Sequence, residues 1–479
     1  MKIVIVPYQE MENLQRNVIY VGHVLDVLRK IPSESLDAIA FSPPYYSKRD
    51  YTQEKGKRVV QAIIWDGDPD CKHDWIHIEP ARKATKGDIP GPNAIFKNQP
   101  IERLRPGKAS DTCSKCGAWR GDLGAEPTFG LYIKHVAAIC DECYRVLKPW
   151  GCMMINMGDS YAGSGGAGGD WNVGKKALEA KWKQQTQDYP DQCLFLVPAR
   201  TAMELIDHHG WCLHNDLVWY KPDPSRESVT TRFTNDHEYI WFFSKQVPKK
   251  PYFYVNRINY HAQRGKPPGI NGQEHVDWEW KPHRACDGKG CAKCRKYGKE
   301  GYMKRSTWMA FKYYFNQMLI PKKHPDVKGS RRFGGNKAKG YGNPRYSGNE
   351  YDSTAHDGNK NMTSTWSLPT SKFTGGHFAT FPVELAARML DAICPREICT
   401  KCELPRVRID GKYWSDCGCN VSYRKGLGLD PFAGAGSSHL AGEQIGVDMI
   451  GIEINPEYAA IARKRINNDE PEPGQMKLF

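Results

Sequence analysis

The sequence contains no long hydrophobic run. No stretch approaches the roughly 18 consecutive apolar residues that a transmembrane helix requires. The opening residues, MKIVIVPYQE, hold an apolar run far shorter than the hydrophobic region of a secretory signal. The chain also has no internal repeat. We therefore expect a soluble, cytoplasmic protein without a membrane partner.

Acidic residues are scarce relative to basic ones. The 479 residues include 68 Lys and Arg against 54 Asp and Glu, which gives a formal net charge of +14. This excess predicts a polyanionic partner, although net charge carries no information about the fold. At this length we expect two or three modules rather than one small core.

Short apolar runs alternate with amphipathic segments, and this alternation predicts an α/β fold. Between about 251 and 370 the periodicity fades into a stretch rich in Gly, Lys, Arg, Asn and Tyr. The expected strands are 17–24, 36–41, 152–159, 213–221, 237–245, 427–430 and 449–454, and the expected helices are 24–32, 131–148, 197–210 and 382–393.

A glycine-bearing turn, in LGLDPFAGAGSS, follows the strand that ends at Asp430. Gly434 and Gly436 have no Cβ, so a ligand can approach the backbone closely there. Asp430 ends its strand at the edge where α/β sheets bind ligands. Glu453 ends the next strand, where a carboxylate can accept hydrogen bonds from two ribose hydroxyls. The dinucleotide pattern GxGxxG does not fit, because His439 occupies the place of the third glycine.

A second unusual turn, SPPYY, follows the buried strand expected at 36–41. Proline has no N–H and a nearly fixed φ, so Pro43 and Pro44 hold their carbonyl groups stiffly. Taken alone, this segment is also compatible with an ordinary turn after a strand.

The two turns together resemble motifs of the amino-methylating DNA methyltransferases, which use S-adenosylmethionine. Asp430 to Gly436 is similar to motif I of that family. Ser42 to Tyr45 is similar to motif IV, whose form is (Asp/Asn/Ser)-Pro-Pro-(Tyr/Phe/Trp). The catalytic motif precedes the cofactor motif, as in the β class of the family. The resemblance implies a Rossmann-like methyltransferase fold, double-stranded DNA as partner and a bacterial, archaeal or phage origin.

The resemblance also implies roles for the site residues. Ser42 and the Pro43 carbonyl would accept hydrogen bonds from an exocyclic amine, whose lone pair is otherwise delocalised into the base. Pro44 would stiffen this loop, and Tyr45 would stack on the flipped base. No covalent intermediate is needed, and the Pro-Cys dipeptide of the cytosine-C5 enzymes does not occur. The implied cofactor-binding residues are Asp430, Pro431, Phe432, Gly434, Gly436 and Glu453, with Phe381 and Pro382 from a segment similar to motif X.

The substrate has several alternatives. In this family a Ser at the first position of motif IV favours cytosine N4, whereas Asp or Asn favours adenine N6. We expect a cytosine-N4 enzyme, with adenine N6 as the alternative. RNA or protein-glutamine methyltransferases share the Pro-Pro-Tyr loop, but the basic insert and the motif order argue against them. A catalytically inactive zinc-bearing DNA-binding protein is the non-enzymatic alternative, and the intact Ser42–Tyr45 loop and Glu453 count against it.

The 16 cysteines are expected to be reduced in the cytoplasm, and several form the short pairs typical of zinc ligands. Cys140 and Cys143 lie on an expected amphipathic helix and are predicted to be core residues. We expect two or three structural zinc sites that hold polar inserts together. The candidate ligands are Cys71, His73, Cys113 and Cys116 in one group, His283, Cys286, Cys291 and Cys294 in another, and Cys399, Cys402, Cys417 and Cys419 in a third.

The expected domain organisation has two catalytic parts separated by a variable region. Residues 1–250 would form the catalytic half, with a zinc-binding insert at about 66–127. Residues 251–370 would recognise the target, with Lys and Arg on phosphates and polar or aromatic side chains on bases. Residues 371–479 would form the cofactor-binding half, with a zinc-ribbon-like insert at about 394–424. A cognate restriction enzyme is a further partner that the family allows.

Overall fold

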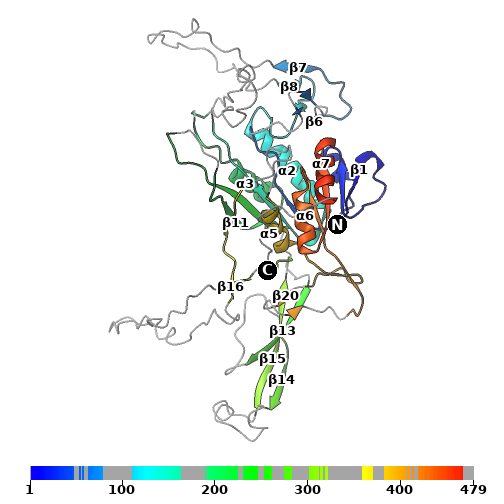
Figure 1. Ribbon diagram of the computed structural model, residues 1–479, viewed down its shortest axis with the longest axis vertical. Coiled ribbons are helices and arrows are strands. Elements are labelled where there is room, and N and C mark those ends of the chain that lie inside the picture. Colours follow the sequence, from blue (N-terminus) through cyan, green and yellow to red (C-terminus); the bar gives the residue numbers. More distant parts are fainter. Residues whose placement is uncertain are drawn as a thin grey trace, which may run out of the picture.

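A nine-stranded mixed β-sheet organises the chain (Figure 1). Its strands, in spatial order, are β1 (Val4–Pro7), β2 (Val18–Val21), β24 (Asp448–Glu453), β23 (Leu427–Asp430), β3 (Leu36–Phe41), β10 (Leu147–Met157), β12 (His237–Ser244), β11 (Cys212–Tyr220) and β18 (Thr365–Ser367). The strands from β1 to β10 are mutually parallel, β12 is antiparallel to both of its neighbours, and β11 pairs in parallel with β18.

The computed structural model describes most of this sheet and part of the connecting segments. The described residues are 2–47, 53–54, 57–58, 63–78, 110–162, 189–190, 192–224, 230–245, 253–261, 275–282, 301–311, 313–316, 319–321, 359–370, 382–406, 408–409, 413–414 and 419–467. Among these residues, no helix is long and apolar enough to cross a membrane.

Helices cover both faces of the sheet, because successive side chains of a strand alternate between the two faces. In β3, Ile39 and Phe41 join the core on one face, whereas Ala38 and Ala40 join the core on the other. Burial on both faces explains why the strands are nearly continuous apolar runs. The first face packs against α1 (Val24–Lys30), α2 (Phe129–Val146) and α3 (Val197–His208), and the second against α5 (Val383–Ile393), α6 (Ser437–Ile445) and α7 (Pro456–Asn467).

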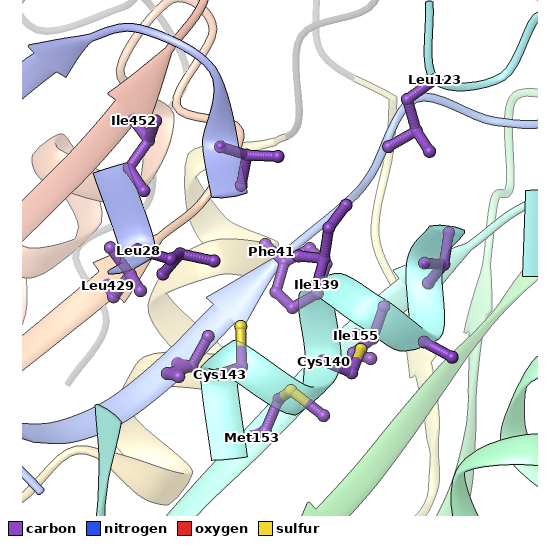
Figure 2. Close-up of a cluster of buried hydrophobic side chains, with 14 of the residues drawn as sticks. Leu28, Phe41, Leu123, Ile139, Cys140, Cys143, Met153, Ile155, Leu429 and Ile452 are labelled. Atoms are coloured by element: carbon purple, nitrogen blue, oxygen red, sulfur yellow. The ribbon is translucent and has the colours of Figure 1, made fainter. Parts of the chain in front are cut away.

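The two ends of the chain build one core (Figure 2). Phe41 from the N-terminal part and Leu429 from the C-terminal part belong to the same buried cluster. Cys140 and Cys143 of α2 lie in this cluster as well, and neither side chain is exposed, which confirms that they are core residues. The segments at both ends are therefore parts of a single packed unit.

A buried ion pair joins the same two parts at the amino end of their strands. The Asp37 carboxylate accepts two hydrogen bonds from the Arg424 guanidinium, at 2.7 and 3.2 Å. It also accepts the backbone N–H of Leu427 at 2.8 Å. Because Asp37 is completely buried, these three donors compensate for its lost hydration.

Two smaller sheets stand apart from the central one in Figure 1. One is a four-stranded sheet in the order β6 (Ile63–Trp65), β9 (Trp119–Gly121), β8 (Ser110–Cys113) and β7 (Trp75–Ile78). The other is antiparallel, in the order β13 (Phe253–His261), β15 (Gly301–Phe311) and β14 (His275–Pro282). The remaining short elements are η1 (Tyr8–Glu10), β4 (Gln53–Glu54), β5 (Lys57–Arg58), β16 (Leu319–Pro321), β17 (Asn359–Asn361), β19 (Ile398–Cys399), β20 (Arg408–Ile409), β21 (Tyr413–Trp414) and β22 (Tyr423–Arg424).

The strands and helices expected from periodicity are all present, so the α/β prediction is confirmed. The fading periodicity after residue 251 suggested little regular structure, yet β13, β14 and β15 occur there. β18 lies in the range expected to recognise the target, and it forms the edge of the central sheet. Tyr314, in the same range, is also buried, and its N–H donates to the carbonyl oxygen of Trp150 in β10 at 2.8 Å.

Candidate active site

The glycine turn and the Pro-Pro turn leave the sheet side by side. β23 and β3 pair in parallel, with Gly428 opposite Ala38 and Leu429 opposite Ile39. From β3 the chain continues to β10 on one side, and from β23 it continues to β24 on the other. Such a reversal of strand order is where open α/β sheets bind ligands. The two turns, which are far apart in the sequence, are therefore adjacent in the fold.

Aromatic side chains mark the contact between the turns. The ring of Phe41, which precedes Ser42, lies 5.8 Å from the ring of Phe432, measured between centroids. Phe432 follows Asp430 and Pro431 in the glycine turn. The first residues of both turns are therefore neighbours in space.

The glycine turn has a backbone that other residues rarely adopt. Gly434 and Gly436 have φ values of 51° and 79°, in the left-handed region. A Cβ on Gly436 would lie 2.6 Å from Cδ1 of Ile466 in α7, so this position also needs glycine for packing. The N–H of Gly434 donates to Oε2 of Glu453 at 2.9 Å. Glu453 also accepts the N–H of Asn455 on Oε1 at 2.9 Å.

Two buried carboxyl groups flank this turn. Asp430 and Glu453 are 4% and 8% exposed. Burial raises the pKa of Asp430 to about 6, and the N–H of Phe432, which donates to Asp430 Oδ1 at 2.9 Å, opposes this shift. Burial likewise raises the pKa of Glu453 to about 7, against the amide bonds from Asn455 and Gly434. Near neutral pH, Glu453 therefore exists in both charge states.

The Pro-Pro turn is anchored from behind. The hydroxyl of Tyr132 in α2 donates to the carbonyl oxygen of Pro44 at 2.9 Å. Gly124 packs so closely that a Cβ there would lie 2.8 Å from the carbonyl oxygen of Tyr45. Within the part of the chain that the structure describes, no donor bonds to the carbonyl of Pro43. The Pro44 carbonyl oxygen thus already accepts a hydrogen bond from Tyr132, whereas the Pro43 carbonyl oxygen can accept one from a ligand.

The side chains of Ser42 and Tyr45 bond to each other. The Ser42 Oγ–H donates to Tyr45 Oη at 3.0 Å. Tyr45 Oη in turn lies 2.7 Å from Glu238 Oε2 and 2.9 Å from Asn156 Oδ1. The ring of Tyr45 packs against Gly158, where a Cβ would approach Cε2 to 2.6 Å. Both the hydroxyl and one side of the ring are therefore held in place.

Three polar residues at this site received no catalytic role from the sequence, although Lys221 and Glu238 lie in a Trp-x-Lys and a His-Glu pair that resemble the family stretch after the catalytic loop. Glu238 forms an ion pair with Lys221, and the two side chains are 14% and 17% exposed. Asn156 is almost fully buried in β10, where its Nδ2 donates to the Tyr239 carbonyl at 3.2 Å. For Asn156 the local signal is a polar residue inside the apolar run CMMINM. The other two lie far from Ser42–Tyr45 in the sequence, so only the strand pairing brings them together.

The residues expected from motif X are only partly described. Pro382 is buried and immediately precedes α5, as the N-cap residue. Phe381 lies outside the described residues.

Two of the three expected metal-ligand groups converge in space. The ligand atoms of Cys71, His73, Cys113 and Cys116 lie within 4.8 Å of one another, as do those of Cys399, Cys402 and Cys419. Such distances suit the tetrahedral sulfur and nitrogen coordination of zinc. Several candidate ligands lie outside the described residues: Cys417, and the whole group His283, Cys286, Cys291 and Cys294.

The strand order and the two turns define an α/β protein with its candidate site at the switch point of the sheet. The sequence profile of the DNA methylase family (N6/N4 methyltransferases) matches residues 36–464. The chain therefore belongs to this family, which confirms the resemblance seen in the two motifs.

Individual relatives share about a quarter or less of their residues with this chain. The type II methyltransferase M.SmaI of Serratia marcescens is 25% identical over 72% of this chain and 77% of its own length. M.XycI of Xanthomonas campestris pv. cyanopsidis, also a type II methyltransferase, is 22% identical over 95% of this chain and 88% of its own length. The solved structure of PvuII DNA methyltransferase (cytosine-N4-specific) superimposes with a TM-score of 0.40 at 13% identity, covering 96% of this chain and 88% of that one. The family assignment rests on the profile match.

Proposed function

We propose that this protein is a site-specific DNA methyltransferase that transfers a methyl group from S-adenosylmethionine to N4 of cytosine in duplex DNA. Membership of the DNA methylase family supports the reaction type. The observation that carries the proposal is the pairing of β23 with β3, which sets Asp430 and the glycine turn beside Ser42–Tyr45. Ser42 at the first motif position favours cytosine N4, with adenine N6 as the alternative.

The cofactor side of the site suits S-adenosylmethionine, which supplies an activated methyl group when bound. The residues that would hold it are Asp430, Pro431, Phe432, Gly434, Gly436 and Glu453, with Phe381 and Pro382 at its methionine end. Each carboxylate oxygen of Glu453 accepts one backbone amide and retains a lone pair for a ribose hydroxyl.

The base side of the site suits an exocyclic amine. Ser42 and the Pro43 carbonyl would accept its N–H groups, which helps the nitrogen to pyramidalise and free its lone pair. The Tyr45 ring, with one side against Gly158, would present the other side to a flipped base. The amine would attack the methyl group directly, without a covalent enzyme intermediate.

Mass spectrometry of nucleosides distinguishes the two candidate bases. DNA from cells that express the protein should contain N4-methylcytosine. N6-methyladenine instead would support the alternative. If the DNA contains neither modified base, the proposal is contradicted. Tyr45→Ala and Gly434→Asp should abolish transfer of a labelled methyl group while circular dichroism shows a retained fold. If the protein binds DNA but wild type and both variants transfer nothing, the inactive DNA-binding alternative holds.

We further propose the domain roles already expected from the sequence. Residues 1–250 would form the catalytic half, 251–370 the target-recognition region and 371–479 the cofactor-binding half. Deletion of the recognition strands within 253–311 should abolish sequence-specific DNA binding while S-adenosylmethionine binding survives. Unchanged specificity would contradict this assignment. The designation of the relatives as type II methyltransferases supports a cognate restriction enzyme as a partner.

Structural zinc is the remaining part of the proposal. The convergence of Cys71, His73, Cys113 and Cys116, and of Cys399, Cys402 and Cys419, supports two sites that stabilise inserts of the catalytic domain. Cys417 would complete the second site. A third site would use His283, Cys286, Cys291 and Cys294.

A further inference from the structure

We propose that Glu238, held by Lys221, fixes the direction of a hydrogen-bond chain through Tyr45, so that Ser42 can only accept a hydrogen bond from the substrate amine. This proposal deepens the proposed methyltransferase function and rests on it. It makes Glu238 and Lys221 positioning residues, because they act through Tyr45 and do not touch the base.

The chain begins at a group that can only accept. An ionised carboxylate has no proton to give, so Tyr45 must donate its hydroxyl proton towards Glu238, whose Oε2 lies 2.7 Å away. Charge-assisted bonds of this kind are the stronger ones. Tyr45 Oη in turn accepts the Ser42 hydroxyl proton over 3.0 Å. Both hydrogen bonds are therefore donated in the same direction: Ser42 donates to Tyr45, and Tyr45 donates to Glu238.

Asn156 reinforces this direction. Its Nδ2 donates to the Tyr239 carbonyl at 3.2 Å, which orients the amide so that Oδ1 faces Tyr45 Oη at 2.9 Å. The carbonyl oxygen of an amide is likewise an acceptor only. Neither Glu238 Oε2 nor Asn156 Oδ1 can supply a proton to Tyr45, so the single hydroxyl proton of Tyr45 points towards these two acceptors, with the shorter contact to Glu238.

The strand pairing sets the geometry of Glu238 and Lys221. Glu238 is opposite Trp219 in the antiparallel pair of β12 with β11, and Lys221 follows β11 directly. Lys221 Nζ bonds to Glu238 Oε1 and sits 4.6 Å from the centre of the Trp219 ring. Lys221 therefore occupies one carboxylate oxygen of Glu238, and the second oxygen faces Tyr45.

The consequence for the reaction concerns Ser42. An exocyclic amine reacts through its nitrogen lone pair, so a hydroxyl that donates to this nitrogen would block the attack. Because the Ser42 proton is committed to Tyr45, its oxygen presents only lone pairs and can accept an amine N–H. Without this constraint the Ser42 hydroxyl can rotate and donate in the unproductive direction.

The test uses single-turnover methyl transfer by the full-length protein on duplex DNA with labelled S-adenosylmethionine. In Glu238→Gln the amide can donate to Tyr45 and reverse the chain, and in Tyr45→Phe the link is missing. Each variant should lower the transfer rate about 10- to 100-fold, as expected for losing a hydrogen bond to a charged group. Equilibrium affinities for DNA and for S-adenosylmethionine should not change. The double variant should be no slower than the slower single variant, because both changes break the same chain.

Glu142→Gln is the matched control. Glu142 also pairs with a cation, Arg145, at 2.8 Å, and its side chain is 23% exposed. It lies in the last turns of α2, which lead into the first residue of β10, at the end of the strand opposite to Asn156 and the Pro-Pro turn. This variant should keep the wild-type rate.

The outcomes separate the two proposals. If wild type transfers no methyl group, the proposed function fails. If wild type is active and Glu238→Gln keeps its rate, or if the two single effects multiply in the double variant, the chain does not orient Ser42. A variant that loses only DNA affinity, with an unchanged transfer rate, would show a purely structural role and would also overturn the inference.

Discussion

At the scale of single residues, the charge of Glu453 should couple cofactor binding to pH. Its pKa is raised to about 7 by burial, from an ordinary value of 4.5. Ribose hydroxyls donate hydrogen bonds to the ionised carboxylate, so the cofactor binds the charged form better. We expect S-adenosylmethionine affinity to increase as the pH rises from about 6 to about 8. Isothermal titration calorimetry at several pH values measures this dependence.

The free energy of unfolding should change with pH in the opposite direction to cofactor affinity. Because burial raises the folded-state pKa of Glu453, its contribution to stability is present at low pH and is lost as the pH rises through about 7. Glu453→Gln should bind the cofactor more weakly and without this pH dependence, apart from a residual slope below pH 6 from Asp430, whose pKa is about 6. A pH dependence identical to wild type would show that Glu453 does not contact the cofactor.

Residues of the site differ in how well the sequence predicts them. Gly434 and Ser42 lie in short, distinctive turns directly after apolar runs, so local reasoning locates them. The contacts of Glu238 and Asn156 with Tyr45 cannot be inferred from the sequence, because Tyr45 lies 193 and 111 positions away. Contacts of this kind depend on the order of strands in the sheet, which periodicity does not contain.

At the scale of elements, the two Cys-x-x-Cys turns have the same backbone. In both, the residue after the second Cys has a positive φ and donates its N–H to the carbonyl of the first Cys, at 3.0 Å. These residues are Gly117, with φ 73°, and Glu403, with φ 58°. The shared geometry, which turns both sulfur atoms to one side, is consistent with a common metal-binding role.

The first of these turns is connected to the candidate active site. His135 of α2 stacks on the rings of both Trp65 and Trp119 of the four-stranded sheet, with ring centroids 4.5 and 5.5 Å away. Just beyond this sheet, the carbonyl of Gly124 accepts the N–H of Ser47 at 2.8 Å. Disorder in the insert would therefore reach the backbone next to Tyr45.

We expect Cys113→Ser to lose one zinc ion per chain and to lower methyl transfer, because the insert would no longer support the Pro-Pro turn. Plasma mass spectrometry measures the metal, and S-adenosylmethionine binding should be retained. Cys193→Ser is the control, since this half-buried Cys lies in neither ligand group. Full zinc content in Cys113→Ser would show that the group does not bind the metal.

Elements with strong periodicity were predicted correctly, and the failures have physical causes. The α2 helix carries a continuous apolar stripe, and β3 is buried on both faces, so both patterns are unambiguous. β1 has only four residues at the edge of the sheet, and its side chains are largely accessible. The strands β13–β15 form a separate sheet without a long apolar run, and their regular pairing with each other could not be read from hydrophobicity.

At the scale of the whole molecule, Arg424 should be essential for stability. Its partner Asp37 is completely buried, and burial raises the pKa of that carboxyl while Arg424 opposes the rise. Arg424→Met would leave the carboxylate without its cation, which we expect to cost about 3–5 kcal/mol. Urea unfolding should still show one main transition, because the N-terminal and C-terminal strands share one sheet.

Arg396→Met is the matched control for this prediction. Arg396 pairs with Asp391 at 2.9 Å, but its side chain is 40% exposed. Exposed pairs contribute about 0–1 kcal/mol, so this variant should unfold close to wild type. Equal midpoints for the two variants would mean that the Asp37–Arg424 pair does not hold the strands together.

Hydrogen bonds join the residue before β1 to the last residue of α7. The N–H of Ile3 donates to Oδ1 of Asn467 at 2.8 Å, and Nδ2 of Asn467 donates back to the Ile3 carbonyl at 3.3 Å. Residues 464 positions apart thus meet at one edge of the sheet, so the first and last elements of the described fold are adjacent in space. A short linker across this junction, with a new opening between the catalytic and cofactor segments, would give a circular permutant with the glycine turn first. The order of the two motifs along the chain would then depend only on the position of the new termini. The pairing of β23 with β3 would stay the same.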